Sequence, residues 1–236
     1  MFIKKKLHIF KNNDTLQVSK KTQVEVVEGL IESSRLTGDF YLMLILSAVV
    51  VTLGLMLNNS AVIIGGMLIT PLLTPVLTLA LGIVIADAKL IWRSVKIVLK
   101  STGIVLGVAL VISLLFPIDE FNLEIESRLI SNIPYFLVAF TAGLAATFAW
   151  ARKDLYAMLP GVAIAVSLLP PLSVFGIGIS KLSGEIARDS LVTFLLNLFG
   201  IILGSVIMFS LLNFYRAKKK VQQEVAKEER EEKEKI

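Results

Sequence analysis

The chain contains no cysteine and a single histidine, His8, among its 236 residues. Without cysteine there can be no disulfide, no thiol nucleophile and no thiolate metal site. We interpret His8 as a solvated residue of a polar N-terminal segment, because no second histidine exists to share a metal ion with it. A serine nucleophile would also lack a histidine base. We therefore expect no metal, no cofactor and no enzyme activity.

Charge is the second absence, because no ionisable side chain lies well inside the long apolar runs. The nearest ones, Asp39, Asp87, Lys100 and Asp154, fall at or near the ends of those runs. Proton relays in membranes need titratable groups within the bilayer, and hydrolysis by paired carboxylates needs them in the site. Both a carboxylate proton relay and an intramembrane hydrolase are therefore disfavoured.

Long apolar runs, by contrast, are abundant, and 55% of the residues are apolar. They come in blocks of about 20 residues, the length that crosses a hydrocarbon layer about 30 Å thick. This pattern predicts an all-α membrane protein with six transmembrane helices, whose first partner is the lipid bilayer. We expect the spans at about 40–57, 60–86, 97–116, 134–150, 155–179 and 191–215.

One short helix is predicted before the first span. A helix that begins at Thr22 is expected near the N-terminus, because Thr22 and Glu25 have capping-box spacing. This amphipathic helix would either pack on the bundle or lie flat on anionic lipid.

The predicted spans divide the chain into five segments. They are an N-terminal segment (1–39), a first transmembrane repeat (40–116), an acidic external loop (117–133), a second transmembrane repeat (134–215) and a charged tail (216–236).

We interpret the net charge of +5 as a sign of how the chain is oriented in the membrane rather than as a sign of nucleic-acid binding. Lysine and arginine concentrate in the cytoplasmic loops of membrane proteins. With six spans, almost all basic segments fall on one side and the acidic loop falls on the other. The exception is the mixed loop 181–189. We therefore expect both termini in the cytoplasm and no nucleic-acid partner.

The chain also matches itself. At an offset of 96, residues 65–83 align with 161–179, so that Gly65 meets Gly161 and Pro75 meets Pro171. At an offset of 97, residues 103–107 align with 200–204. Each unit has three spans, an odd number, so the second unit would be inverted relative to the first. Inverted repeats are common in secondary transporters.

The second alignment pairs two G-x-x-x-G motifs, Gly103/Gly107 and Gly200/Gly204. Such motifs let helices approach closely in membranes. They predict close helix–helix contacts and, because six spans form a thin bundle, a homo-oligomer.

The second and fifth spans are interrupted by glycine and proline. Proline removes a backbone donor, and broken backbone is tolerated in a membrane only against protein or a water-filled cavity. Paired breaks in two inverted halves therefore point to a substrate site built from backbone ends and hydroxyls. The alternative is that the breaks only serve packing. In that case Thr70, Thr74 and Thr78, which recur every four residues on one face of the second span, bond to their own helix. The candidate substrate-binding residues are Asn58, Gly65, Gly66, Thr70, Pro71, Thr74, Pro75, Gly161, Ser167, Pro170, Pro171 and Asn197.

These motifs carry a family resemblance. Residues 53–67 (LGLMLNNSAVIIGGM), followed by Pro71-Leu72-Leu73-Thr74-Pro75, resemble a prokaryotic family of multi-pass membrane proteins, the domain of unknown function 389. The second half is similar in residues 159–165, in 169–172 and at Asn197. The resemblance covers about residues 24–214 and implies a multi-pass protein of the prokaryotic inner membrane. It implies no activity.

Two functions are compatible with these observations. The first is a transporter or channel for a small solute or ion, with its pathway at the paired broken helices near the membrane midplane. The second is a membrane scaffold that does not transport. Its basic face and charged tail would recruit a cytoplasmic partner or anionic lipid.

Overall fold

The fold is that of a computed structural model, which describes residues 18–116, 120–130, 132–159, 161–162 and 167–217. These residues are helical or irregular, and no strand occurs among them. The predicted basic segment before residue 18 and the charged tail from residue 218 lie outside the described residues. The elements are α2 (Lys20–Ser33), α3 (Gly38–Met56), α4 (Ser60–Ile69), α5 (Leu73–Val84), α6 (Ala88–Leu115), α7 (Leu123–Glu126), α8 (Ile133–Trp150), η2 (Lys153–Met158), α10 (Leu169–Ser180), α11 (Gly184–Leu211) and η3 (Phe214–Ala217).

Four helices are long and apolar enough to cross a membrane, namely α3, α6, α8 and α11. α4 and α5 together would form a fifth span, and their axes are bent by 54° at the break between them. α10 has only 12 residues, and residues 163–166 before it lie outside the described residues. The described chain is therefore a helical membrane protein with four or five candidate spans, where the sequence predicted six.

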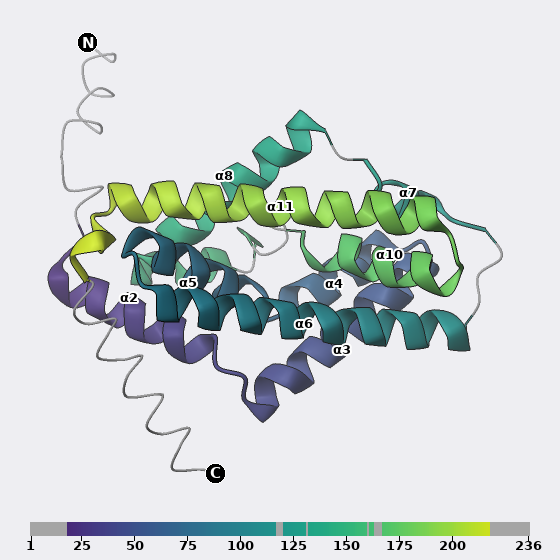
Figure 1. Cartoon of the computed structure of the whole chain (residues 1–236), viewed down its shortest axis with the longest axis horizontal. Coiled ribbons are helices and arrows are strands. Elements are labelled where there is room, and N and C mark those ends of the chain that lie inside the picture. Colours follow the sequence, from purple (N-terminus) through teal and green to yellow (C-terminus); the bar gives the residue numbers. More distant parts are fainter. Residues whose placement is uncertain (1–17, 117–119, 131, 160, 163–166, 218–236) are drawn as a thin grey trace.

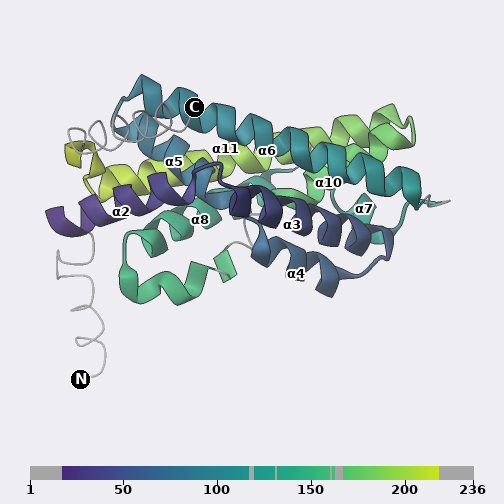
Figure 2. The ribbon, with the colours of Figure 1, turned by 90° about the horizontal axis from the view of Figure 1, so that it is seen from below.

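The two longest helices, α6 and α11, run along the length of the molecule (Figure 1). α5 and α10 lie at opposite ends of the molecule, and each packs against both long helices. α3 packs against α6, and α8 packs against α11. We refer to the two ends of the bundle as the α2 end and the α7 end, after the elements found there (Figures 1 and 2).

Polar side chains in the connections define where the helices begin. The Thr37 hydroxyl accepts a hydrogen bond from the Phe40 N–H at 3.2 Å, at the start of α3. The Asp87 carboxylate accepts from the Leu90 N–H at 2.9 Å, at the start of α6. A helix leaves its first four N–H groups without intrahelical partners, so such caps stabilise its start. The isolated polar residues between apolar runs thus set the helix boundaries.

Three hairpins connect α3 to α4, α5 to α6, and α10 to α11 with the same backbone geometry. Each has one residue in the left-handed region, Asn58 (φ 52°), Ala86 (φ 52°) or Leu182 (φ 53°). The next residue donates its N–H to the carbonyl of a glycine five positions earlier, at 2.9 to 3.0 Å. These glycines, Gly54, Gly82 and Gly178, lie against the following helix so closely that a Cβ atom would come within 3.1 Å of it. The glycine therefore permits the tight turn.

The helix boundaries of the two halves coincide at an offset of 96. α5 and α10 begin and end 96 residues apart, and so do α6 and α11. The buried positions of α6 recur in α11 at the same offset, with Leu90, Ser94, Ser101 and Val105 matching Ile186, Ser190, Asn197 and Ile201. The geometry of these helices thus repeats at 96, not at the 97 that aligned their G-x-x-x-G motifs.

That one-residue difference separates the two glycine pairs. Gly200 and Gly204 face α8, and a methyl group at Gly204 would overlap the carbonyl oxygen of Phe140. Gly103 and Gly107 are exposed, and a Cβ atom at either would meet nothing within 4 Å. Only the second pair therefore makes a close helix contact within the chain.

α2 packs at one end of the bundle, against α5 and η3 (Figure 2). It begins at Lys20 rather than at Thr22, because the Ser19 hydroxyl is the capping group and accepts from the Thr22 N–H at 3.1 Å. Its buried apolar side chains are Val26, Val27, Leu30 and Ile31. α2 thus belongs to the folded bundle.

Candidate functional site

A cavity of about 310 Å³ opens beside the break that precedes α10. It is bounded by α4, α8, α11, the residues that follow α7, Ser167 and the first turn of α10. Most of its wall is aliphatic, and its polar side chains are Ser60, Ser127, Arg128, Tyr135, Ser167, Thr193 and Asn197. An apolar cavity of this size with a few convergent polar groups is typical of a small-molecule site. This cavity is the candidate site.

Asn197 and Ser167 form its deepest polar contact. Asn197 projects from α11, is only 8% exposed, and donates through Nδ2 to the Ser167 carbonyl at 3.1 Å. Ser167 has φ 38°, a left-handed conformation that L-residues adopt at a cost of about 1 to 2 kcal/mol. The amide thus satisfies a carbonyl that the broken helix leaves without a helical partner.

The start of α10 offers fewer free amides than a helix usually does. Its cap residue, Leu168, makes no side-chain capping hydrogen bond. However, Pro170 and Pro171 occupy the first turn and have no N–H to satisfy. The sequence predicted free backbone ends at this break, both amides and carbonyls, and the same prolines remove two of the amides. Carbonyl groups and the Asn197 side chain therefore dominate the polarity here.

An ion pair lies beside the cavity, at the end nearer α7. Arg128 Nη2 lies 3.1 Å from Glu124 Oε2, and both side chains are largely buried. Glu124 Oε1 also accepts a short hydrogen bond from Ser60, the first residue of α4. The Arg128 Nε–H is buried and has no partner among the described residues. Arg128, which lines the cavity, therefore has one N–H donor, at Nε, without a partner among the described residues.

α7 is attached to the bundle by two asparagines. Asn122 Nδ2 donates to the Leu55 carbonyl at 2.8 Å, and Asn58 Oδ1 accepts from the Glu124 N–H at 3.2 Å. Asn58, a predicted site residue, thus lies at the turn between α3 and α4 and holds α7. It does not line the cavity.

α2 packs against α5, next to the first break, which lies between α4 and α5. Thr74 Oγ1 lies 3.1 Å from the carbonyls of both Ser33 and Pro71. Thr78 Oγ1 lies 3.2 Å from the Leu30 carbonyl and 2.8 Å from that of Thr74. Two predicted hydroxyls therefore contact α2. They combine that contact with bonding to their own helix, which was the alternative interpretation.

The remaining predicted residues lie in several environments. Pro75 is buried in α5, and the Thr70 hydroxyl is buried without a partner among the described residues. Gly66 packs against Val51 of α3, whereas Gly65 and Gly161 have open space where a side chain would be. Of the twelve candidates, Ser167, Pro171 and Asn197 line the cavity.

Sequence reasoning missed the α4, α8 and loop residues of the cavity. Arg128 carried the one available signal, because it is the single cation of an otherwise acidic loop. Ser60, Tyr135 and Thr193 carried none, since isolated hydroxyls at span ends are common. Among the described residues, no group of three or more His, Asp or Glu side chains could hold a metal ion. The cavity is therefore mostly apolar, with a few neutral polar groups and one ion pair at its rim.

The apolar helices and the cavity beside α10 define a class, a multi-pass helical membrane protein with a cavity that contains a few polar groups. The model of the family described as "Domain of unknown function (DUF389)" matches residues 67–203, more than half of the chain. The chain belongs to this family, which confirms the resemblance seen in its motifs.

The chain is also 33% identical over 177 residues to an uncharacterized protein of Methanocaldococcus jannaschii. The match covers 75% of this chain and 55% of the relative, so the chain spans about half the length of that curated protein. No solved structure matches. The comparisons thus identify a family of prokaryotic membrane proteins and leave the activity to the chemistry of the site.

Proposed function

We propose that this protein is a transporter or channel for a small solute or ion and not an enzyme. The observation that carries this proposal is the cavity beside the second break, where buried Asn197 bonds to the Ser167 carbonyl. Broken backbone inside a membrane lines cavities and pathways in transporters. The site offers carbonyls, hydroxyls and an amide, so it suits a small polar cargo better than a proton relay.

We propose further that the protein has six spans in two inverted three-helix units. The offset of 96 shared by the boundaries of α5 and α10, and of α6 and α11, supports this duplication. On this proposal, η2 and residues 161–162 precede α10 as α4 precedes α5, and together they complete the sixth span.

Inversion gives the cavity an equivalent at the other end of the molecule. The counterparts of Pro171 and Asn197 at the offset of 96 are Pro75 and Ser101, and both are buried. The Ser101 hydroxyl is buried without a partner among the described residues. α2 covers this region through its contacts with Thr74 and Thr78. On this proposal, the conformation described is the state of an alternating-access cycle in which the half with the α10 cavity is accessible and the half under α2 is closed.

The α2 end is the cytoplasmic end on this proposal, because the basic residues concentrate there, and the membrane is the prokaryotic inner membrane. The exposed Gly103/Gly107 face of α6 supports a homo-oligomer, since a second copy can approach it closely. Neither inference is needed for the transport experiment.

Flux through liposomes tests the proposal. Purified protein is reconstituted, and the uptake of a broad panel of ions and small polar solutes is measured. We expect a selective flux that Asn197→Ala reduces by about tenfold or more, because the Ser167 carbonyl loses its buried donor, a change of about 1 to 3 kcal/mol. Ser210→Ala is the matched control, since Ser210 lies on the exposed side of the same helix and, among the described residues, its hydroxyl bonds only to the Val206 carbonyl.

Folded protein that passes no member of the panel would contradict the proposal and leave the scaffold as the better account. The scaffold predicts instead a cytoplasmic partner or lipid held by the basic face. Equal flux in the native chain and in Asn197→Ala would support transport but show that this cavity is not its pathway.

A further inference from the structure

A basic groove runs along the first half of α6, at the α2 end. Its volume is about 340 Å³, and Leu36, in the link between α2 and α3, lines it together with side chains of α6. Its cations are Lys89, Arg93, Lys96 and Lys100, spaced four, three and four residues apart. This spacing places all four on one face of the helix. The groove therefore combines a stripe of positive charge with an apolar edge.

The aromatic and apolar residues of the groove suit an interfacial position. Trp92 is 61% exposed, and the Lys96 ammonium lies 5.4 Å from the centroid of its ring. Ile97 is buried at the base. Tryptophan is enriched where hydrocarbon meets headgroups.

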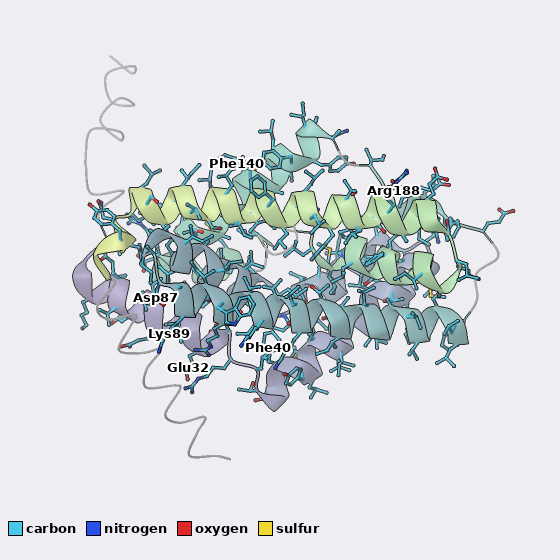
Figure 3. All side chains as sticks on the ribbon, in the orientation of Figure 1. Glu32, Phe40, Asp87, Lys89, Phe140 and Arg188 are labelled. Atoms are coloured by element: carbon cyan, nitrogen blue, oxygen red, sulfur yellow. The ribbon has the colours of Figure 1, made fainter. Side chains whose placement is uncertain are left out.

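Nearby acids partly balance the first turn of α6. The Asp87 carboxylate caps the helix, and Lys89 and Arg93 both interact within the chain. Figure 3 shows Glu32, Asp87 and Lys89 at the same end of the molecule. Lys96 and Lys100 lie two to three turns further along α6 and are exposed. Like charges four residues apart destabilise a helix by a few tenths of a kcal/mol. An external anion would relieve that repulsion.

The length of α6 sets the depth of the stripe. At about 1.5 Å per residue a 28-residue helix is about 42 Å long. The hydrocarbon layer is about 30 Å thick, so about 12 Å, or about eight residues, extends beyond it. With Leu115 at the opposite boundary, this excess is residues 88–95. Lys96 then lies at the boundary, and Lys100 reaches it with its long side chain. The anions at this depth are lipid phosphates.

The equivalent end of α11 is an internal control for the charge. At the offset of 96, the four cation positions are occupied there by Glu185, Asp189, Val192 and Leu196. The α10–α11 hairpin has the same backbone geometry, and Figure 3 shows Arg188 at the far end of the molecule from Lys89. The hairpin itself therefore does not require the cations. An excess of basic residues on the cytoplasmic side of a membrane protein would explain the cations, but it would not explain why a groove lies beside them.

We infer that this groove binds an anionic phospholipid, with Lys96 and Lys100 at its phosphate and an acyl chain against Leu36 and Ile97. Basic pockets between helices on the cytoplasmic side are suited to such headgroups. The site is distinct from the cavity beside α10 and does not depend on transport.

Trp92 provides the measurement. The full chain is reconstituted in vesicles of zwitterionic lipid that contain a small, equal fraction of either brominated phosphatidylglycerol or brominated phosphatidylcholine. Bromine quenches tryptophan only at short range, so the acyl chains are brominated close to the glycerol backbone, next to the headgroup region where Trp92 lies. The Trp92 signal is the difference between the native chain and Trp92→Phe, so Trp150 is left unchanged. We expect stronger quenching by the anionic lipid, and this preference falls about tenfold or more in Lys96→Gln/Lys100→Gln.

Arg188→Gln, which removes a cation at the other end, is the matched control and should retain the preference. Inorganic phosphate at tens of millimolar should leave the preference unchanged, because the acyl chain contributes to binding. Equal quenching by the two brominated lipids overturns the inference. So does a preference that the double variant retains. Full displacement by inorganic phosphate would assign the groove to free phosphate and exclude a lipid site.

Discussion

At the scale of single residues, the cavity depends on a strained serine and the asparagine that supports it. Ser167 holds φ 38°, and Asn197 from a different helix bonds to its carbonyl. Strained backbone persists only where surrounding contacts determine it, and it concentrates at binding sites and switches. The strain and the buried amide thus mark the same place, which supports a functional role for this break.

The two glycine pairs give a test at this scale. We predict that Gly204→Ala destabilises the protein by about 1 to 3 kcal/mol, because its methyl group would overlap the Phe140 carbonyl of α8. Gly107→Ala is the matched variant and should be neutral, or stabilising by up to about 1 kcal/mol, since it has open space and alanine favours helix.

Thermal unfolding of both variants in detergent checks the prediction. Equal destabilisation would show that Gly107 also packs closely, and a dependence of that loss on protein concentration would attribute the contact to a second copy.

At the scale of elements, the sequence pattern predicted most of the features that local interactions determine, namely the positions of the apolar helices and of the turns between them. The apolar runs located α3, α6, α8 and α11, and the polar turns located the hairpins, because a membrane permits few alternatives to capped helices. The residues that line the cavity were harder to predict. Ser60 and Tyr135 come from helices that meet only after packing, and nothing local distinguishes them from other residues at span ends.

The threonines of α5 show the same limit. Their spacing of four predicted one polar face, and the structure has that face. Its neighbour is α2, whose carbonyls at Leu30 and Ser33 meet Thr78 and Thr74. A pattern identifies a face, whereas tertiary packing decides what the face contacts.

We predict that Thr78→Val loosens α2. An isolated 14-residue helix is marginal in water, so α2 depends on its contacts with α5. Loss of the hydrogen bond to Leu30 should weaken docking by about 1 kcal/mol, which raises the hydrogen-exchange rate of α2 amides about fivefold. Thr141→Val is the control, because the Thr141 hydroxyl bonds only within α8. Unchanged exchange in Thr78→Val would show that apolar packing alone holds α2.

At the scale of the whole molecule, the absence of cysteine becomes an experimental advantage, since single cysteines can be placed without a background. Thr193 lines the cavity beside α10 and is 6% exposed, whereas Ser101, the counterpart of Asn197, is fully buried in the half that α2 closes. Alternating access requires that these two regions exchange their exposure. A rigid scaffold requires that they do not.

We predict that Thr193→Cys reacts with a membrane-impermeant thiol reagent added at the α7 side. Ser101→Cys should react with the same reagent added at the α2 side. Adding Thr78→Val, which loosens α2, should accelerate the reaction of Ser101→Cys about fivefold or more. It should not accelerate the reaction of Thr193→Cys. A slow, state-dependent reaction of Ser101→Cys would mean that the closed half opens in the folded protein. A Ser101→Cys thiol that reacts only after denaturation, in both backgrounds, would exclude alternating access. The cavity beside α10 would then be either one side of a fixed channel or a structural pocket, and the flux of Asn197→Ala distinguishes those two.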